Sequence, residues 1–238
     1  MQAKLEREYY LRASDFDCNG KIRISAVLEL FQDIAGAHAA MLGCSGEEMQ
    51  KRGLLWVLVG VRLQILKQPK EHSVVKILTW PLEQKGIRFV RDYKVFDENG
   101  ELIILGSSKW AFIDIAERKL ARVSDIYPSE LDYCTDKSFE ADEKIPTFSE
   151  ADATYTVVPQ FSHLDTNNHV NNTKYADFIM DSLGSVSQSV IAAQIDYKSE
   201  VLYKEPLTIA YKNEQNATLF KGTDENGQTK FIAKFTWN

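Results

Sequence analysis

The sequence has few cysteines, no long apolar run and no net basic charge, and each absence excludes a class of protein. Its three cysteines are odd in number and lack CxxC spacing, which argues against a disulfide framework or a structural zinc. No run of about 18 apolar residues could span a membrane, and residues 1–12 lack the apolar segment of a signal peptide. The sequence therefore predicts a cytoplasmic protein in a reducing compartment, with no membrane insertion.

The net charge of −6 argues against a nucleic-acid binder, which needs a basic face. The charge is unevenly distributed along the chain, however. Residues 62–94 carry eight Lys or Arg side chains against three acidic ones. This local excess could contact an acidic partner, although a solvated strand surface is the more ordinary interpretation. The sequence assigns no single Lys or Arg to such a contact.

The chain contains an internal duplication. Residues 17–22 align without gaps with residues 165–170, at an offset of 148. The sequence Asp-Glu-Asn-Gly at 97–100 recurs at 224–227, and each copy is followed by a Trp thirteen residues after its Asp. Two matches in the same order indicate that one structural unit occurs twice.

Each copy is predicted to contain a polar loop, an apolar helix and several antiparallel strands. Ser25 is the predicted N-cap of the first helix and Asn171 or Asn172 that of the second, while Gly43 and Gly184 are predicted to end them. Each Asp-Glu-Asn-Gly sequence predicts a hairpin between two strands. The predicted strands are 55–66, 72–80, 87–97 and 101–114 in the first copy, and 190–200, 206–213, 216–223 and 228–237 in the second.

This pattern predicts an α+β fold in which a buried helix packs on a curved antiparallel sheet, twice. Residues 123–150 contain two prolines and scattered acidic residues without periodicity, and are predicted to link the copies. The predicted units are therefore 1–122 and 151–238.

The second copy carries the candidate chemistry. A polar run, Asp165 to Asn172, directly precedes its helix, and His169 stands where the first copy has Lys21. Histidine is not a favoured turn or cap residue, and it exchanges protons near neutral pH. The N-terminus of a helix presents unpaired N–H groups that suit an oxyanion or a polarised carbonyl.

Several other chemistries lack their motifs. The sequence contains no Gly-x-Ser-x-Gly elbow, no phosphate-binding glycine loop and no His-Glu-x-x-His zinc motif. The residues alone therefore leave metal-free acid–base or acyl chemistry, with no cofactor implied.

The run from Asp165 to Tyr175, Asp-Thr-Asn-Asn-His-Val-Asn-Asn-Thr-Lys-Tyr, resembles the active-site signature of the acyl-acyl carrier protein thioesterases. Four further segments also resemble sequences of this family and occur in the same order along the chain: 55–58, 75–80, 106–110 and 196–200. The resemblance implies a tandem (double) hotdog fold, in which each of two long helices is wrapped by an antiparallel sheet. It also implies hydrolysis of fatty acyl thioesters on acyl carrier protein. The first unit would bind the acyl chain and the second would be catalytic.

Carried over by motif, the resemblance makes Asp165, Asn167, His169 and Glu200 the catalytic set. Many plant members have a cysteine after this Glu, but here the residue is Val201, so a cysteine acyl-enzyme at that position is excluded. Glu200 or His169 is expected to act as base toward a water, and the N–H groups at the start of the second helix to polarise the carbonyl. Asn167 is expected to help hold the carbonyl or the water, and Asp165 to orient its neighbours. Attack by Asp165 itself is the alternative route.

Three other functions stay open at this point. A hotdog acyl-coenzyme A thioesterase would share the hydrolytic residues, and a 3-hydroxyacyl dehydratase would also need a His and a carboxylic acid. A non-catalytic acyl-binding module is the third, because a fold does not fix a function. A duplicated chain supplies internally the pairing that single hotdog units obtain by dimerising, which leaves homodimerisation open but not required.

Overall fold

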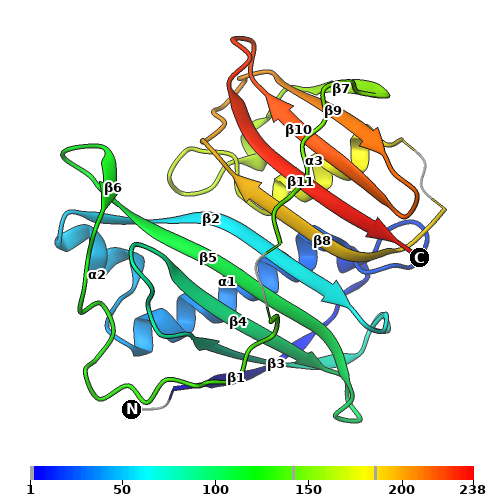
Figure 1. Cartoon of the computed structure of the whole chain (residues 1–238). Helices are drawn as coiled ribbons and strands as arrows, with labels where there is room; N and C mark the ends of the chain where they lie inside the picture. Colours follow the sequence, from blue (N-terminus) through cyan, green and yellow to red (C-terminus); the bar gives the residue numbers. More distant parts are fainter. Residues whose placement is uncertain (1–2, 141–142, 185–186) are drawn as a thin grey trace.

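The computed structural model describes residues 3–140, 143–184 and 187–238. The chain folds into two units of like architecture that share one antiparallel sheet (Figure 1). The first unit contains β1 (Leu5–Tyr10), η1 (Ala13–Asp15), α1 (Ile24–Met41), α2 (Gly46–Lys51), β2 (Leu54–Ile65), β3 (Val74–Pro81), β4 (Phe89–Phe96), β5 (Leu102–Asp114) and β6 (Lys119–Ala121). The second contains β7 (Ala153–Val157), η2 (Phe161–His163), α3 (Lys174–Ser182), β8 (Val190–Tyr197), β9 (Leu207–Asn213), β10 (Ala217–Thr223) and β11 (Thr229–Trp237).

The strand order shows the duplication directly. It runs β1-β3-β4-β5-β2-β8-β11-β10-β9-β7, with β6 paired to β5. The two edges of the sheet are β1 and β7, which are the first strands of the two units. The middle of the sheet is formed by β2 of the first unit and β8 of the second. Those two central strands pair antiparallel, from Gly60 opposite Asp196 to Gln64 opposite Ala192, and so join the two units.

Both longer helices lie on the same face of this sheet, and the segment that links the units crosses the opposite face (Figure 1). Strand periodicity explains the burial: on β2, Val61 and Leu63 point into the core, whereas Gln64 is exposed. The apolar side of α1 packs onto that inner face, where the Phe31 ring stacks on Tyr93 with centroids 4.2 Å apart. The buried core continues from one unit into the other without a break.

The predicted hairpins are confirmed, and they share one turn geometry. Asp97 Oδ1 accepts the backbone N–H groups of Asn99 and Glu101 at 2.9 Å each, and Asp224 holds the second hairpin in the same way. Gly100 and its counterpart adopt left-handed backbone with φ of 78° and 77°, which glycine reaches without a steric penalty. All eight predicted strands are present, with ends that shift by no more than a few residues.

The predicted N-caps are wrong, whereas the predicted helix ends are confirmed. α1 begins at Ile24, so Ser25 lies inside the helix, and its hydroxyl donates to Asp177 Oδ1 of α3 at 2.5 Å. The N-cap of α3 is Thr173, because Asn171 forms its own turn by accepting the N–H of Thr173 through its side-chain oxygen. Both helices end two residues before a left-handed glycine, at 43 or 184, which follows the C-cap residue.

Sequence patterns missed β1, β7, β6 and α2. β1 and β7 lie at the two edges of the sheet, where most of their side chains are exposed, so no apolar alternation marks them. Residues 123–140 and 143–150 contain no helix or strand. They are nevertheless fixed to the first unit: Trp80 Nε1 donates to the carbonyl of Asp136, and the N–H of Ser138 donates to Asp92 at 2.7 Å.

The continuous sheet predicts that the two units unfold together. Leu63 lies on β2, beside the junction with β8, and is 1% exposed. Leu63→Ala should lower the free energy of unfolding by about 2–5 kcal/mol, because it removes buried methyl groups and leaves a cavity. Calorimetry should show one transition that shifts as a whole. Two separate transitions, of which only the one for the first unit shifts to lower temperature, would contradict cooperative unfolding of the sheet.

Candidate functional site

The polar run that precedes α3 is organised by the carboxylate of Asp165. Its Oδ1 accepts the backbone N–H groups of Asn167 at 2.8 Å and His169 at 3.2 Å, while its own N–H donates to the His169 carbonyl at 2.8 Å. Asn168 sits at the tip of this turn with a φ of 62°, in the left-handed region that Asn tolerates. The Asp165 carboxylate therefore holds the loop that presents His169.

The first unit contains the same turn. Asp17 Oδ1 accepts the N–H groups of Asn19 at 2.8 Å and Lys21 at 2.9 Å, and Gly20 takes the left-handed position with a φ of 68°. Both units thus keep the backbone frame, and the Asp and the first Asn are the same in both turns. The fifth position holds Lys21 in one unit and His169 in the other, and only the second unit has a histidine there, a residue that exchanges protons near neutral pH.

His169 and Glu200 meet across two loops. His169 Nε2 lies 3.3 Å from Glu200 Oε2, and both side chains keep contact with solvent, at 33% and 54% exposure. The backbone brings them together, because the N–H of Val170 donates to the Val201 carbonyl at 2.9 Å and His169 forms a bridge with Leu202. A His–carboxylate pair that is open to solvent can exchange a proton with a bound water or substrate.

Asn167 is the predicted site residue that the structure does not bring into this pair. Its backbone N–H is bound by Asp165, but its side chain is exposed, and within the described residues it makes no hydrogen bond. The expected backbone donors at the start of α3 are also partly occupied, since the N–H groups of Thr173 and Lys174 both donate to Asn171. The side-chain amide of Asn167 is therefore available to a ligand in a way that those two N–H groups are not.

Lys230 supports the loop that carries Glu200, and sequence analysis missed it. This β11 residue is 6% exposed, and its ammonium contacts the Glu200 carbonyl at 3.0 Å, Glu205 at 2.6 Å and Asp224 at 3.3 Å. Burial opposes the charged form, but the hydrogen bonds that the ammonium donates to Glu205 and Asp224 prevail and raise the pKa of Lys230. In the sequence it is an ordinary Lys within a strand, and only its partners from other segments reveal its role.

Aromatic side chains lie beneath the site. The Tyr197 hydroxyl, at the end of β8, donates to the Asn172 carbonyl at 2.9 Å, and its ring packs edge-on against Tyr175 of α3. Burial raises the pKa of the Tyr197 hydroxyl, so it stays protonated and keeps donating. Val201, where a thiol would be needed for cysteine chemistry, is fully buried.

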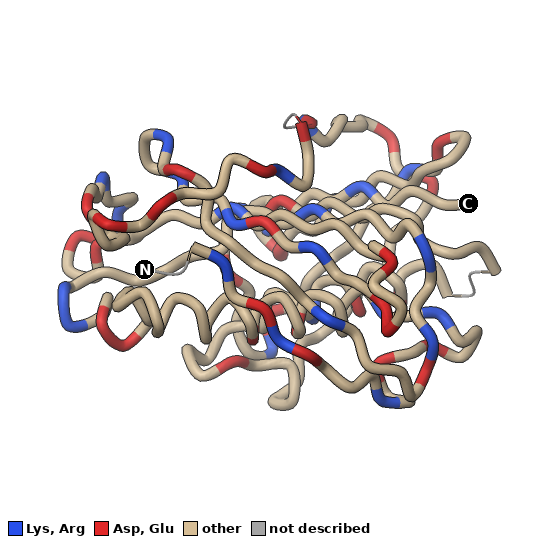
Figure 2. The backbone as a smooth tube through the Cα atoms, turned by 90° about the horizontal axis from the view of Figure 1, so that it is seen from below, with Lys and Arg blue, Asp and Glu red and all other residues tan. Residues whose placement is uncertain are grey.

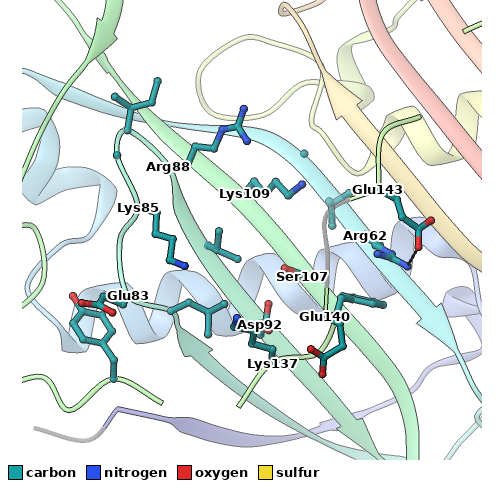
Figure 3. A pocket seen from close by; sticks show the side chains of 18 of the residues that line it. Arg62, Glu83, Lys85, Arg88, Asp92, Ser107, Lys109, Lys137, Glu140 and Glu143 are labelled. Atoms are coloured by element: carbon teal, nitrogen blue, oxygen red, sulfur yellow. Dashed lines mark hydrogen bonds and ion pairs between the residues drawn. The ribbon is translucent and has the colours of Figure 1, made fainter. Parts of the chain in front are cut away.

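A larger hollow lies elsewhere, between the outer face of the sheet and the connecting segment. It measures about 890 Å³ and is lined by both signs of charge. Figure 3 shows Lys85 and Arg88 toward one end of it and the Arg62–Glu143 ion pair, at 2.9 Å, toward the other. Neither His169 nor Glu200 lines this hollow, so it is not the candidate catalytic site.

The basic excess predicted at residues 62–94 is largely offset in the folded chain. Four of its eight cations form ion pairs with acidic residues from outside the segment, and Arg91 is buried against His38. Figure 2 accordingly shows basic and acidic residues interspersed along the strands. In the part of the chain that the structure describes, no helix is long and apolar enough to cross a membrane.

Comparison with known proteins gives two family matches. Residues 2–131 match the acyl-ACP thioesterase N-terminal domain, where ACP is acyl carrier protein, and residues 148–238 match the acyl-ACP thioesterase C-terminal domain. The acyl-[acyl-carrier-protein] hydrolase FATB2 of Cuphea viscosissima is 26% identical over 211 residues, which are 82% of this chain and 51% of that protein. Oleoyl-acyl carrier protein thioesterase 2 of Arabidopsis thaliana is 27% identical over 250 residues, or 94% of this chain and 67% of that one. The chain thus spans about half the length of the Cuphea relative.

Solved structures establish the fold class. An acyl-ACP thioesterase from Bacteroides thetaiotaomicron superposes with a TM-score of 0.89 at 20% identity, over 99% of this chain and 98% of that one. The 12:0-ACP thioesterase from Umbellularia californica gives 0.88 at 20% identity, over 100% and 98%. The predicted α+β tandem hotdog fold is confirmed.

The two Asp-centred turns predict a matched set of stability effects. Asp165→Ala and Asp17→Ala each remove an acceptor of two backbone N–H groups, so each should lower the free energy of unfolding by about 1–3 kcal/mol. Asp165→Asn keeps a side-chain oxygen in the same place and should cost much less. Urea unfolding of the three variants checks this. If Asp165→Asn is as destabilising as Asp165→Ala, the loop depends on the negative charge of the carboxylate and not merely on a side-chain oxygen that accepts the two N–H groups.

Proposed function

Because the chain belongs to the acyl-ACP thioesterase family, we propose that it hydrolyses fatty acyl thioesters of acyl carrier protein to a free fatty acid and the carrier-protein thiol. The observation that carries the proposal is the His169–Glu200 pair, 3.3 Å apart and open to solvent. The pair lies in the second unit, where the polar loop carries His169. The matching loop of the first unit carries Lys21 at that position, and of the two residues only the histidine exchanges protons near neutral pH.

In the proposed reaction a water attacks the thioester carbonyl carbon while His169 or Glu200 takes its proton. The carbonyl oxygen becomes an oxyanion, which the Asn167 side-chain amide is free to stabilise. Collapse of the tetrahedral intermediate breaks the C–S bond, and the proton held by the His–Glu pair passes to the departing thiolate. The products are the fatty acid and the carrier thiol, with no covalent enzyme intermediate.

Asp165 has an orienting role in this scheme. One of its oxygens already accepts two backbone N–H bonds that close the turn, and an oxygen whose lone pairs are occupied in this way is a poorer nucleophile. Attack by Asp165 would form a mixed anhydride, which can be trapped chemically. We therefore favour direct attack by water.

We further propose a division of labour between units 1–122 and 151–238, with 123–150 as the connecting segment. The first unit holds the acyl chain and the second performs the chemistry. One chain supplies both, so the site needs no homodimer. We also propose a cytoplasmic location, although the plant relatives named above are chloroplastic proteins.

Replacement of His169 should abolish turnover, and the duplication offers a matched control. His169→Ala should reduce the release of free thiol from acyl-ACP by about 100-fold or more, because it removes one partner of the proton-transfer pair. Lys21→Ala changes the equivalent position of the first unit and should leave turnover near that of the unmodified protein. Free thiol is followed with purified acyl-ACP of several chain lengths.

Two outcomes of that assay would contradict the assigned roles. Full activity in His169→Ala would remove the histidine from the mechanism. Full activity in Glu200→Gln would leave His169 as the only base of the pair.

The carrier should be preferred over coenzyme A when both bear the same acyl chain. We expect a higher kcat/KM for acyl-ACP than for acyl-CoA, since the matched family is that of the acyl-ACP thioesterases. The two substrates are compared in the same thiol assay. Equal or greater efficiency on acyl-CoA would favour an acyl-CoA thioesterase, and an enoyl product from a 3-hydroxyacyl chain would favour a dehydratase. Stoichiometric binding without thiol release would indicate an acyl-binding module.

A further inference from the structure

Exposed apolar side chains gather on the two loops that carry the candidate site. Within the described residues, twelve large apolar or aromatic side chains are exposed, and Phe161, at 82%, is the most exposed of them. Four of the twelve lie either shortly before the Asp165 turn or shortly after Glu200. These four, which we call the apolar patch, are Val158, Phe161, Leu202 and Tyr203.

Main-chain bonds join the two loops, so the four side chains belong to one surface. The N–H of Lys204 donates to the Pro159 carbonyl at 3.2 Å, and His169 forms a bridge with Leu202. The N–H of Leu202 also donates to Glu205 Oε2 at 2.7 Å. The apolar patch is therefore held in place before a partner arrives, which lowers the entropy cost of binding.

A patch of this kind is typical of a protein–protein interface. Single exposed apolar residues are ordinary, but a group of them beside a site marks a surface that another molecule covers. Aromatic side chains are enriched at the centres of such interfaces, because each supplies a large apolar area. Phe161 and Tyr203 are the aromatic members of the apolar patch.

The position of the apolar patch favours the carrier of the substrate as its partner. A carrier protein presents its acyl thioester on a flexible arm, so it must dock within reach of the His169–Glu200 pair. Phe161 precedes Asp165 by four positions, and Leu202 follows Glu200 by two. A carrier that covers the apolar patch would therefore face both loops of the candidate site.

The charges around the apolar patch admit an acidic carrier protein but attract it only weakly. Segment 158–164 contains no acidic residue, and the acids of the other loop, Glu200 and Glu205, pair with His and Lys side chains. Among the described residues Lys204 has no ion-pair partner, and its ammonium lies over the Tyr203 ring, 5.1 Å from the centroid. The chain as a whole carries a net charge of −6, which repels an acidic protein at long range. Apolar contact therefore has to supply most of the affinity.

We propose that the apolar patch is the docking surface for the acyl carrier protein, and that apolar contact rather than ionic attraction provides most of the affinity. Phe161 and Tyr203 would be covered by the carrier, with Lys204 beside them to meet one of its carboxylates. This inference rests on the proposed function, because it takes acyl-ACP as the substrate.

The test compares two thioesters of the same acyl chain, one on ACP and one on N-acetylcysteamine, a small thiol without a carrier protein. Phe161→Ser should raise KM for acyl-ACP by about 10-fold or more, the loss expected when a central aromatic contact is removed. Its KM for the small thioester should hardly change. The variant should fold, since the ring is exposed. An equal rise of both KM values would place Phe161 in the acyl-binding path and overturn the docking surface.

Leu66→Ser is the matched control. Leu66 is 49% exposed and directly follows β2, at the end of the junction where β8 begins, whereas Glu200 follows the other end of β8. Its replacement should leave KM for both thioesters unchanged. If Leu66→Ser raises KM for acyl-ACP as much as Phe161→Ser does, the effect belongs to surface apolarity in general, and the docking surface is refuted.

Ionic strength separates apolar docking from ionic docking. Binding of ACP without an acyl chain is measured by calorimetry from about 0.05 M to about 0.5 M salt, a range over which exposed charges become screened. The Kd should rise by less than about three-fold, and Phe161→Ser should weaken binding at every salt concentration. A steep loss of affinity with salt, together with unchanged affinity in Phe161→Ser, would show docking through basic side chains and overturn the proposal.

Docking and hydrolysis can fail separately. Binding of ACP that depends on Phe161, without thiol release from either thioester, would support the docking surface and refute the proposed hydrolysis. Thiol release from both thioesters, with KM unaffected by Phe161→Ser, would refute the docking surface and leave the hydrolysis standing. Self-association or binding to lipid vesicles that Phe161→Ser abolishes, with carrier binding unchanged, would assign the apolar patch to a second copy or to a membrane and overturn the proposal.

Discussion

β2 and β8 pair antiparallel along Gly60 to Gln64, and this pairing determines where everything else lies. Each unit alone would leave its central strand with unpaired N–H and C=O groups along one side. Joined, the two strands make one sheet and place α1 beside α3, where Ser25 donates to Asp177 and Lys174 pairs with Glu29. The start of α3 then borders the interior of the first unit. The proposed catalytic site in the second unit therefore borders the unit that we propose to hold the acyl chain.

The two copies keep the same backbone turn, but they differ in its side chains and in the segments that contact it. The turn around Asp17 and the turn around Asp165 have the same hydrogen bonds, but the segments that flank them differ. The N–H of Ile22 donates to the side chain of Gln68. Its counterpart, the N–H of Val170, instead donates to a main-chain carbonyl of the loop that follows β8. That loop carries Glu200, so this exchange of acceptor is what brings a carboxylate next to the histidine.

Features set by neighbouring residues could be predicted from the sequence, and features set by distant ones could not. The hairpin turns, the helix ends at Gly43 and the buried strands follow from local turn chemistry and periodicity. The Ser25 cap was wrong because its hydroxyl bonds to a residue 152 positions away. Glu200 entered the candidate site only through resemblance, since a charged residue at a strand end carries no signal of its own. Lys230 went unnoticed for the same reason: its partners lie in two other segments, the loop between β8 and β9 and the turn between β10 and β11.

The candidate site is held by its backbone and leaves its reactive side chains free. The loop of His169 is fixed by the Asp165 turn and by the bond from Val170 to Val201, and Lys230 fixes the loop of Glu200 through a main-chain carbonyl. None of these bonds uses the imidazole or the Glu200 carboxylate, which contact each other and solvent. A proton-transfer pair needs fixed positions and unoccupied lone pairs together. Support through the main chain meets both requirements, because it restricts the Cα positions without occupying the groups that must exchange the proton.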